Sequence, residues 1–160
     1  MKNLQINEKT AKEIYPGASE ALKAILVETF GKKLFRKKEY TDFETFDDLC
    51  QAIGTTEIEF NKKWDPAEFD PSTIAFEKLK VCTRAYNPDW KFNAYDTNQR
   101  KYYPYFEVLS SGFGLSGAGY YYDYADTSVG SRLCFESAEK AAHAGRTFLK
   151  LFEDFITAIY

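Results

Sequence analysis

The sequence predicts an α+β fold, in which a small antiparallel sheet of about three or four strands packs against helices. Apolar residues recur at helical spacing up to about Tyr86. Residues 102–135 are instead rich in aromatic residues and glycine, with side chains that alternate along the chain. Because a chain of 160 residues can bury one sizeable core, we expect a single domain over residues 1–160.

The first part of the chain, residues 1–86, is expected to be mainly helical. A short opening helix would end at Pro16–Gly17, since proline and glycine both interrupt helices. Ser19 is a typical N-cap for a second helix, and Gly31 is a typical residue to end it.

Two further helices are marked by their N-terminal residues. Thr45 and Asp48 resemble a capping box for a helix that stops at Gly54. Asp70–Pro71 places a capping carboxylate before a proline suited to the first helical position, and this predicts a helix over 71–85.

The sheet is expected to follow a polar loop over 87–101, which is rich in turn residues. Residues 102–109 predict an edge strand, because Pro104 lacks the N–H that a central strand needs. Residues 113–124 fit either two strands or one bent strand, and 131–135 fit a short strand. Aromatic side chains are expected to pin the loop to the body of the domain, namely Trp90, Phe92 and Tyr95.

A long amphipathic helix over 137–157 is predicted to close the domain. Ser137 is its expected N-cap, and small residues near its start allow close approach to the sheet. We expect this helix and the N-terminal helices to cover one face of the sheet, which leaves the other face for function.

Composition excludes several classes of protein. Three widely spaced cysteines argue against a disulfide scaffold and suggest a reducing compartment. A net charge of −3 does not indicate a general binder of polyanions. No apolar run approaches the roughly 20 residues needed to span a bilayer, so we expect a cytoplasmic protein.

A G-x-G-x-x-G motif at Gly112–Gly117 does not predict a dinucleotide site. That chemistry requires a helix to open at the loop, whereas Tyr120–Tyr122 continues the β pattern. Asp123 and Asp126 are too few for a metal site. We therefore expect no cofactor and no metal.

A basic cluster follows Gly31, and it could neutralise the phosphates of a nucleic acid. Acidic residues follow it closely and could screen it, so a solvated face is the favoured interpretation. The nucleic-acid-binding candidates are Lys32, Lys33, Arg36, Lys37 and Lys38.

The aromatic excess, 18% of the chain, is the most unusual feature of the composition. Exposed aromatic residues are common in recognition surfaces, and an arginine can clamp a carboxylate such as Glu107 or an anionic ligand. The partner-binding candidates are Trp90, Tyr103, Tyr105, Tyr121 and Arg132.

His143 is the only histidine, and its sequence neighbours provide no nucleophile or orienting group. It is interpreted as a surface histidine near Glu139, and no residue is assigned a catalytic role.

Four segments together resemble a family of small uncharacterised proteins carried by phages, prophages and related mobile elements of gut bacteria. They are Asn87–Trp90, Lys101–Phe106, Ser111–Gly114 and Gly130–Phe135. The resemblance implies a phage or mobile-element accessory protein and carries over no catalytic residue.

We expect a non-enzymatic module that binds a protein partner or itself. The alternative is a nucleic-acid-binding protein that uses the basic cluster. A third hypothesis is an enzyme whose site is assembled from residues distant in the sequence.

Overall fold

The computed structural model describes residues 6–36, 38–93, 95–96, 98–109, 112–121 and 133–158. The chain divides into two compact units, unit 1 (Met1–Lys38) and unit 2 (Glu39–Tyr160). The single domain predicted for residues 1–160 therefore stays a prediction.

Unit 1 is a pair of helices, α1 (Glu8–Ile14) and α2 (Glu20–Phe30), with a 3-10 turn between them. Ser19 caps α2 by accepting a hydrogen bond from the backbone of the helix, and Gly31 ends it with a φ of 84°, as the sequence predicts. Its described residues bury only two side chains, Ala11 and Leu26.

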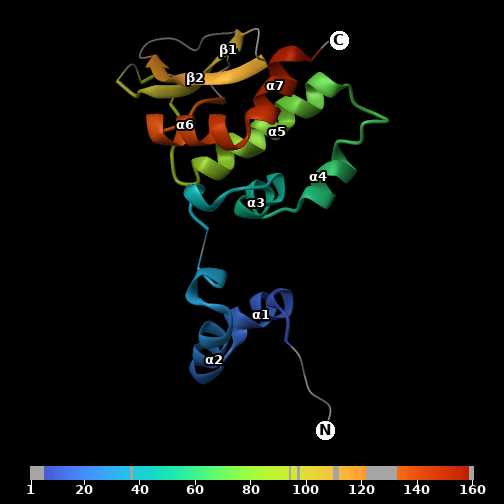
Figure 1. Ribbon diagram of the computed structural model, residues 1–160, viewed down its shortest axis with the longest axis vertical. Coiled ribbons are helices and arrows are strands. Elements are labelled where there is room, and N and C mark those ends of the chain that lie inside the picture. The colour runs from blue at the N-terminus through green and yellow to red at the C-terminus, as the bar shows by residue number, and fades with distance from the viewer. Residues whose placement is uncertain are drawn as a thin grey trace. The chain divides into compact units, whose positions relative to one another are not determined.

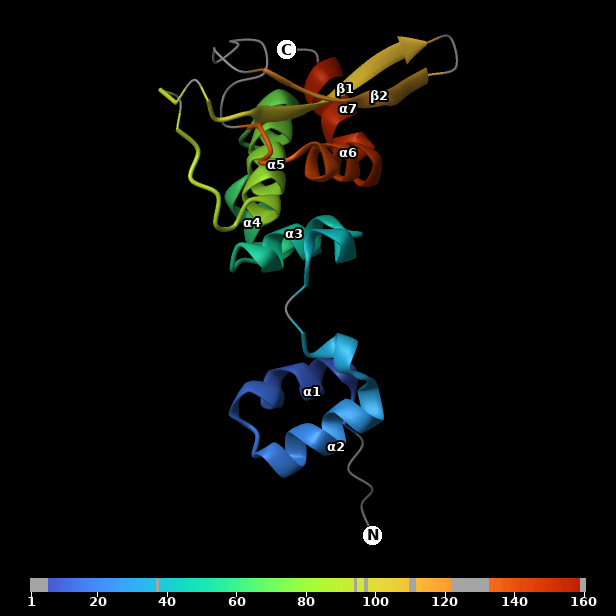
Figure 2. The same cartoon turned by 90° about the vertical axis from the view of Figure 1, so that its left-hand side faces the viewer.

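Unit 2 has three layers (Figures 1 and 2). An antiparallel hairpin, β1 (Lys101–Leu109) and β2 (Gly112–Tyr121), lies over a layer of three helices. These are α5 (Pro71–Tyr86), α6 (Ala138–Thr147) and α7 (Leu149–Thr157). The third layer contains α3 (Phe46–Ala52) and α4 (Glu57–Lys63).

The hairpin packs closely on α6. A β-bulge interrupts its register between Tyr105 and Phe106, where Ser116 faces no partner residue. A Cβ atom on Gly145 of α6 would lie 2.7 Å from Leu115 Cδ1, so glycine permits this approach. The G-x-G-x-x-G motif lies within β2 and does not open a helix.

Aromatic side chains fill the centre of the core. Tyr86 and Phe135 are both 0% exposed, and their rings meet edge to face with centroids 5.6 Å apart. Phe152 of α7 packs on Phe106 of β1, so the hairpin and the helices share one core.

The long C-terminal helix predicted for 137–157 is wrong as a continuous element. Its N-cap is Ser137 as predicted, but the helix breaks at Phe148, whose φ and ψ are −113° and 34°. Gly145 and Thr147 are weak helix formers, which lowers the cost of a break. Phe148 is 6% exposed and meets Tyr86 edge to face, so core packing favours the break.

The predicted strand over 131–135 is also corrected. Leu133 lies in a 3-10 turn, and Phe135 forms only an isolated bridge to Tyr102 of β1. Ser131 and Arg132 lie outside the described residues. Two strands are therefore present in the described part of the sheet.

The other sequence predictions in unit 2 have mixed outcomes. The helix predicted over 71–85 is confirmed as α5, and the described residues of 87–100 form a loop. The sequence reading missed α4. Within the described residues, none of the helices is both long enough and apolar enough to cross a membrane.

Candidate binding site

A cavity of about 250 Å³ lies beside Trp90 in unit 2, and we call it the Trp90 cavity. It is formed by the last turns of α5, the loop that follows and the segment before α6. Its lining residues are Lys80, Thr83, Arg84, Asn87, Trp90, Phe92 and Cys134.

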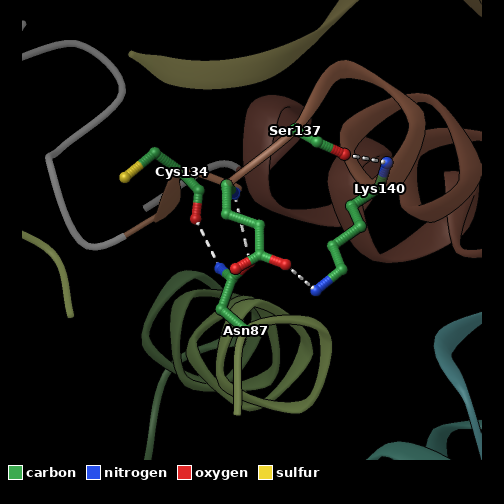
Figure 3. Close-up of polar contacts among 5 residues, drawn as sticks. Asn87, Cys134, Ser137 and Lys140 are labelled. Atoms are coloured by element: carbon green, nitrogen blue, oxygen red, sulfur yellow. Dashed lines mark hydrogen bonds and ion pairs between the residues drawn. The ribbon is translucent and has the colours of Figure 1, made fainter. Parts of the chain in front are cut away.

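Asn87 joins two of these segments (Figure 3). It ends α5, and its side-chain Nδ2 donates a hydrogen bond of 2.9 Å to the carbonyl oxygen of Cys134. Its Oδ1 accepts a hydrogen bond of 3.1 Å from the backbone N–H of Glu136. One carboxamide therefore fixes the end of α5 against residues 134–136.

The loop that carries Trp90 is held by its own hydrogen bonds. Gln99 Nε2 donates to the carbonyl of Lys91, and Gln99 Oε1 accepts from the backbone N–H of Asn93. Trp90 and Phe92 are half-buried, with ring centroids 5.8 Å apart. Tyr95 is 95% exposed, so the prediction that it pins the loop is wrong.

Lys101, the first residue of β1, is buried next to Phe92, one of the residues that line the cavity. It is 1% exposed, and its Nζ has no hydrogen-bond partner among the described residues. Nζ lies 5.6 Å from the centroid of the Phe92 ring. A cation–π contact stabilises a buried ammonium by about 2 kcal/mol, whereas burying an ion costs several kcal/mol.

Cys134 does not supply the missing negative charge. Burial raises the pKa of its thiol to about 11, although a hydrogen bond from Tyr103 and the nearby charge of Lys101 act in the opposite direction. The thiol is therefore neutral near pH 7. The described residues therefore leave the Lys101 ammonium without a hydrogen-bond acceptor.

The rim of the cavity is also cationic. Lys80 Nζ pairs with Glu77 Oε1 at 2.5 Å, so much of its charge is compensated within α5. Arg84 is exposed and makes no ion pair with any described residue. Within the part of the chain that the structure describes, no lining residue carries a carboxylate.

A second cavity, of about 440 Å³, lies on another side of unit 2, and we call it the His143 cavity. The prediction that His143 lies at the surface near Glu139 is confirmed in part, because both residues line this cavity, but the ring is half-buried and bound to Tyr86. The lining residues are Tyr40, Thr41, Ala118, Ala138, Glu139, Ala142, His143 and Arg146.

The hydrogen bond between Tyr86 and His143 defines the state of the imidazole. Tyr86 Oη lies 2.8 Å from His143 Nδ1, and burial raises the pKa of Tyr86 well above its usual range. The hydroxyl therefore keeps its proton, and it shares a hydrogen bond with Nδ1. Burial, followed by the charge of Arg146, lowers the pKa of His143 and so favours the neutral ring.

The predicted partner-binding residues that the structure describes differ in their exposure. Tyr103 is 3% exposed and belongs to the core, whereas Tyr105 is 40% exposed on the hairpin. Trp90 lines the cavity described above. Arg132 and the side chain of Tyr121 lie outside the described residues.

The predicted nucleic-acid-binding residues belong to unit 1, whereas Trp90 belongs to unit 2. Lys32, Arg36 and Lys38 are exposed. Lys37 and the side chain of Lys33 lie outside the described part of the chain. Nucleic-acid binding by this cluster stays a prediction.

Sequence reasoning identified Trp90 but missed Lys101 and the pair of Tyr86 and His143. The partners in that pair are 57 residues apart, and no spacing in the sequence indicates such a contact. A lysine at the start of a strand likewise carries no sign of burial.

No protein-family model, curated protein or solved structure matches this chain. The geometry of unit 2 is therefore the basis for the functional argument.

Proposed function

We propose that this chain is a protein-interaction module and that the Trp90 cavity receives part of a polypeptide partner. The observation that carries the proposal is that half-buried Trp90 lines a small cavity whose floor is formed by buried residues. Tryptophan and arginine are the residues most often found at the energetic centre of protein interfaces. Trp90 and Arg84 both line this cavity.

The size of the cavity favours a side chain over a cofactor. Sites for small molecules usually enclose about 300–1,000 Å³. The Trp90 cavity measures about 250 Å³, which is suited to one or two side chains of a bound segment. Thr83 and Cys134 are 4% and 2% exposed, so its floor is part of the packed core.

The biological setting follows from the sequence resemblance. As an accessory protein of a phage or mobile element, the module would act by binding another protein. This assignment is an expectation from the four resembling segments and is independent of the cavity.

Selection from a phage-displayed library of random twelve-residue peptides tests the proposal. We expect the full chain to enrich peptides whose affinity falls at least tenfold in the Trp90→Ala variant. Trp64 and Trp90 are the only two tryptophans, so Trp64→Phe leaves Trp90 as the sole fluorescent reporter of peptide binding.

Tyr95→Ala is the matched control, because Tyr95 lies in the same loop and is 95% exposed. Circular dichroism establishes that each variant is folded. A selection that enriches no peptide, or only peptides that bind the Trp90→Ala variant equally well, would overturn the proposal.

A further inference from the structure

We infer that the segment bound at the Trp90 cavity presents a carboxylate, supplied by an aspartate or glutamate beside an apolar side chain. This inference rests on the proposed function and adds the chemistry of the partner.

The first step is the position of Lys101. Phe92 lines the cavity and also lies within cation–π distance of Lys101 Nζ. Cys134 lines the cavity as well, and the charge of Lys101 acts on its thiol. The ammonium therefore lies close to two of the residues that line the cavity.

The second step is the environment of that charge. Lys101 is 1% exposed, and water does not screen it as it screens a surface lysine. The described residues offer Nζ no hydrogen-bond acceptor. A carboxylate in the cavity would gain attraction from this charge through the protein interior.

The third step is the rim. Arg84 has a planar guanidinium that can hold a carboxylate with two parallel hydrogen bonds. Lys80 is occupied by Glu77, so Arg84 is the cation of the lining that is available for direct contact. None of the described residues that line the cavity is acidic, so none of them competes with an incoming carboxylate.

The final step is the apolar part of the partner. Half-buried Trp90 and Phe92 present ring surface at the same cavity. An acidic residue next to a leucine or an aromatic residue would satisfy the cations and cover the rings together.

Synthetic copies of the selected peptides test the inference by fluorescence titration in the Trp64→Phe background. We expect the peptides to contain aspartate or glutamate, and replacing that residue by asparagine or glutamine should weaken binding at least tenfold. Arg84→Gln and Lys101→Met should each remove most of this discrimination. Lys91→Gln, in the same loop but outside the lining, should retain it.

The outcomes separate the two proposals. Trp90-dependent peptides that bind equally well with the amide replacement would overturn the inference and leave the proposed function standing. A selection without Trp90-dependent peptides would overturn the proposed function itself.

A double-mutant cycle tests the premise that the counter-charge comes from outside the chain. We expect Lys101→Met and the pair Asp123→Asn and Asp126→Asn to change the urea midpoint independently. Coupling between the two changes would assign the counter-charge to the chain's own carboxylates and overturn the inference.

Discussion

Tyr86 and Lys101 are both buried polar residues of unit 2, but only the first has its polar group satisfied. Tyr86 is 0% exposed, and its hydroxyl lies 2.8 Å from His143 Nδ1. Lys101 is 1% exposed, and its ammonium lacks a hydrogen-bond partner among the described residues. Tyr86 therefore needs no further partner, whereas the described residues leave the Lys101 ammonium without an acceptor.

This difference separates stability from function. A buried hydroxyl with a partner stabilises the fold by about 1 kcal/mol, together with the packing of its ring. A buried charge without a partner destabilises the free protein. Such a charge is a useful marker of a binding site because a buried polar group without a hydrogen bond calls for an explanation.

The largest change in the free energy of unfolding is expected when Tyr86 is replaced. Tyr86→Ala deletes a ring that contacts Tyr40, Phe43, Phe135 and Phe148, and we expect a loss of about 3–5 kcal/mol in the free energy of unfolding. Urea denaturation measures it. Tyr95→Ala should change the free energy by less than about 0.5 kcal/mol. A loss below about 1 kcal/mol for Tyr86→Ala would contradict the described core.

A gain in stability is expected when the charge of Lys101 is removed. Lys101→Met keeps the length and apolar stem of the side chain but removes the charge, and we expect the unliganded protein to gain about 1–3 kcal/mol. Thermal and urea denaturation without added peptide measure the change. A loss of stability would show that the ammonium is already compensated in the free protein.

The smallest effect is the pH dependence of stability that comes from His143, the partner of Tyr86. Burial lowers the pKa of His143 below 6.5, so the unfolded chain takes up this proton first as the pH falls. Its stabilising contribution is complete above about pH 6.5 and is lost at lower pH, with a slope of at most about 1.4 kcal/mol per pH unit.

The groups that face His143 fix the sign of this dependence. Burial and the charge of Arg146 disfavour the protonated ring, and the uncharged Tyr86 hydroxyl shares a hydrogen bond with Nδ1. Tyr40 and Thr147 add only uncharged contacts. Between pH 5 and 8, the urea midpoint of the His143→Gln variant should depend less on pH than that of the wild type. An unchanged slope would refute the role of His143 in this pH dependence.

Helices could be predicted from the sequence where an N-cap residue marks the first turn. Ser19, Thr45 and Asp70 each accept the expected backbone hydrogen bond at a helix start. The missed helix α4 has the same signal, because Thr56 and Glu59 form a capping box before a single buried apolar residue, Phe60. Sequence reasoning passed over it because the apolar stripe is so short.

The C-terminal break and the site were not predictable for a different reason. Phe148 continues the apolar stripe whether or not the helix bends, so the bend depends on the aromatic core formed by distant segments. Lys101 and Tyr103 lie on the same face of β1, and their burial depends on which segments pack against that face. Such properties arise from tertiary packing, and alternation along a strand does not specify them.

The two side-chain hydrogen bonds of Asn87 affect how unit 2 folds. They join positions that are 47 and 49 residues apart, so closing them requires a large loss of chain entropy. Long-range contacts of this kind slow folding, because the chain entropy is lost before the contacts reward it. Deuterium uptake at the amide of Glu136 would therefore report whether this contact, and with it the floor of the Trp90 cavity, has formed.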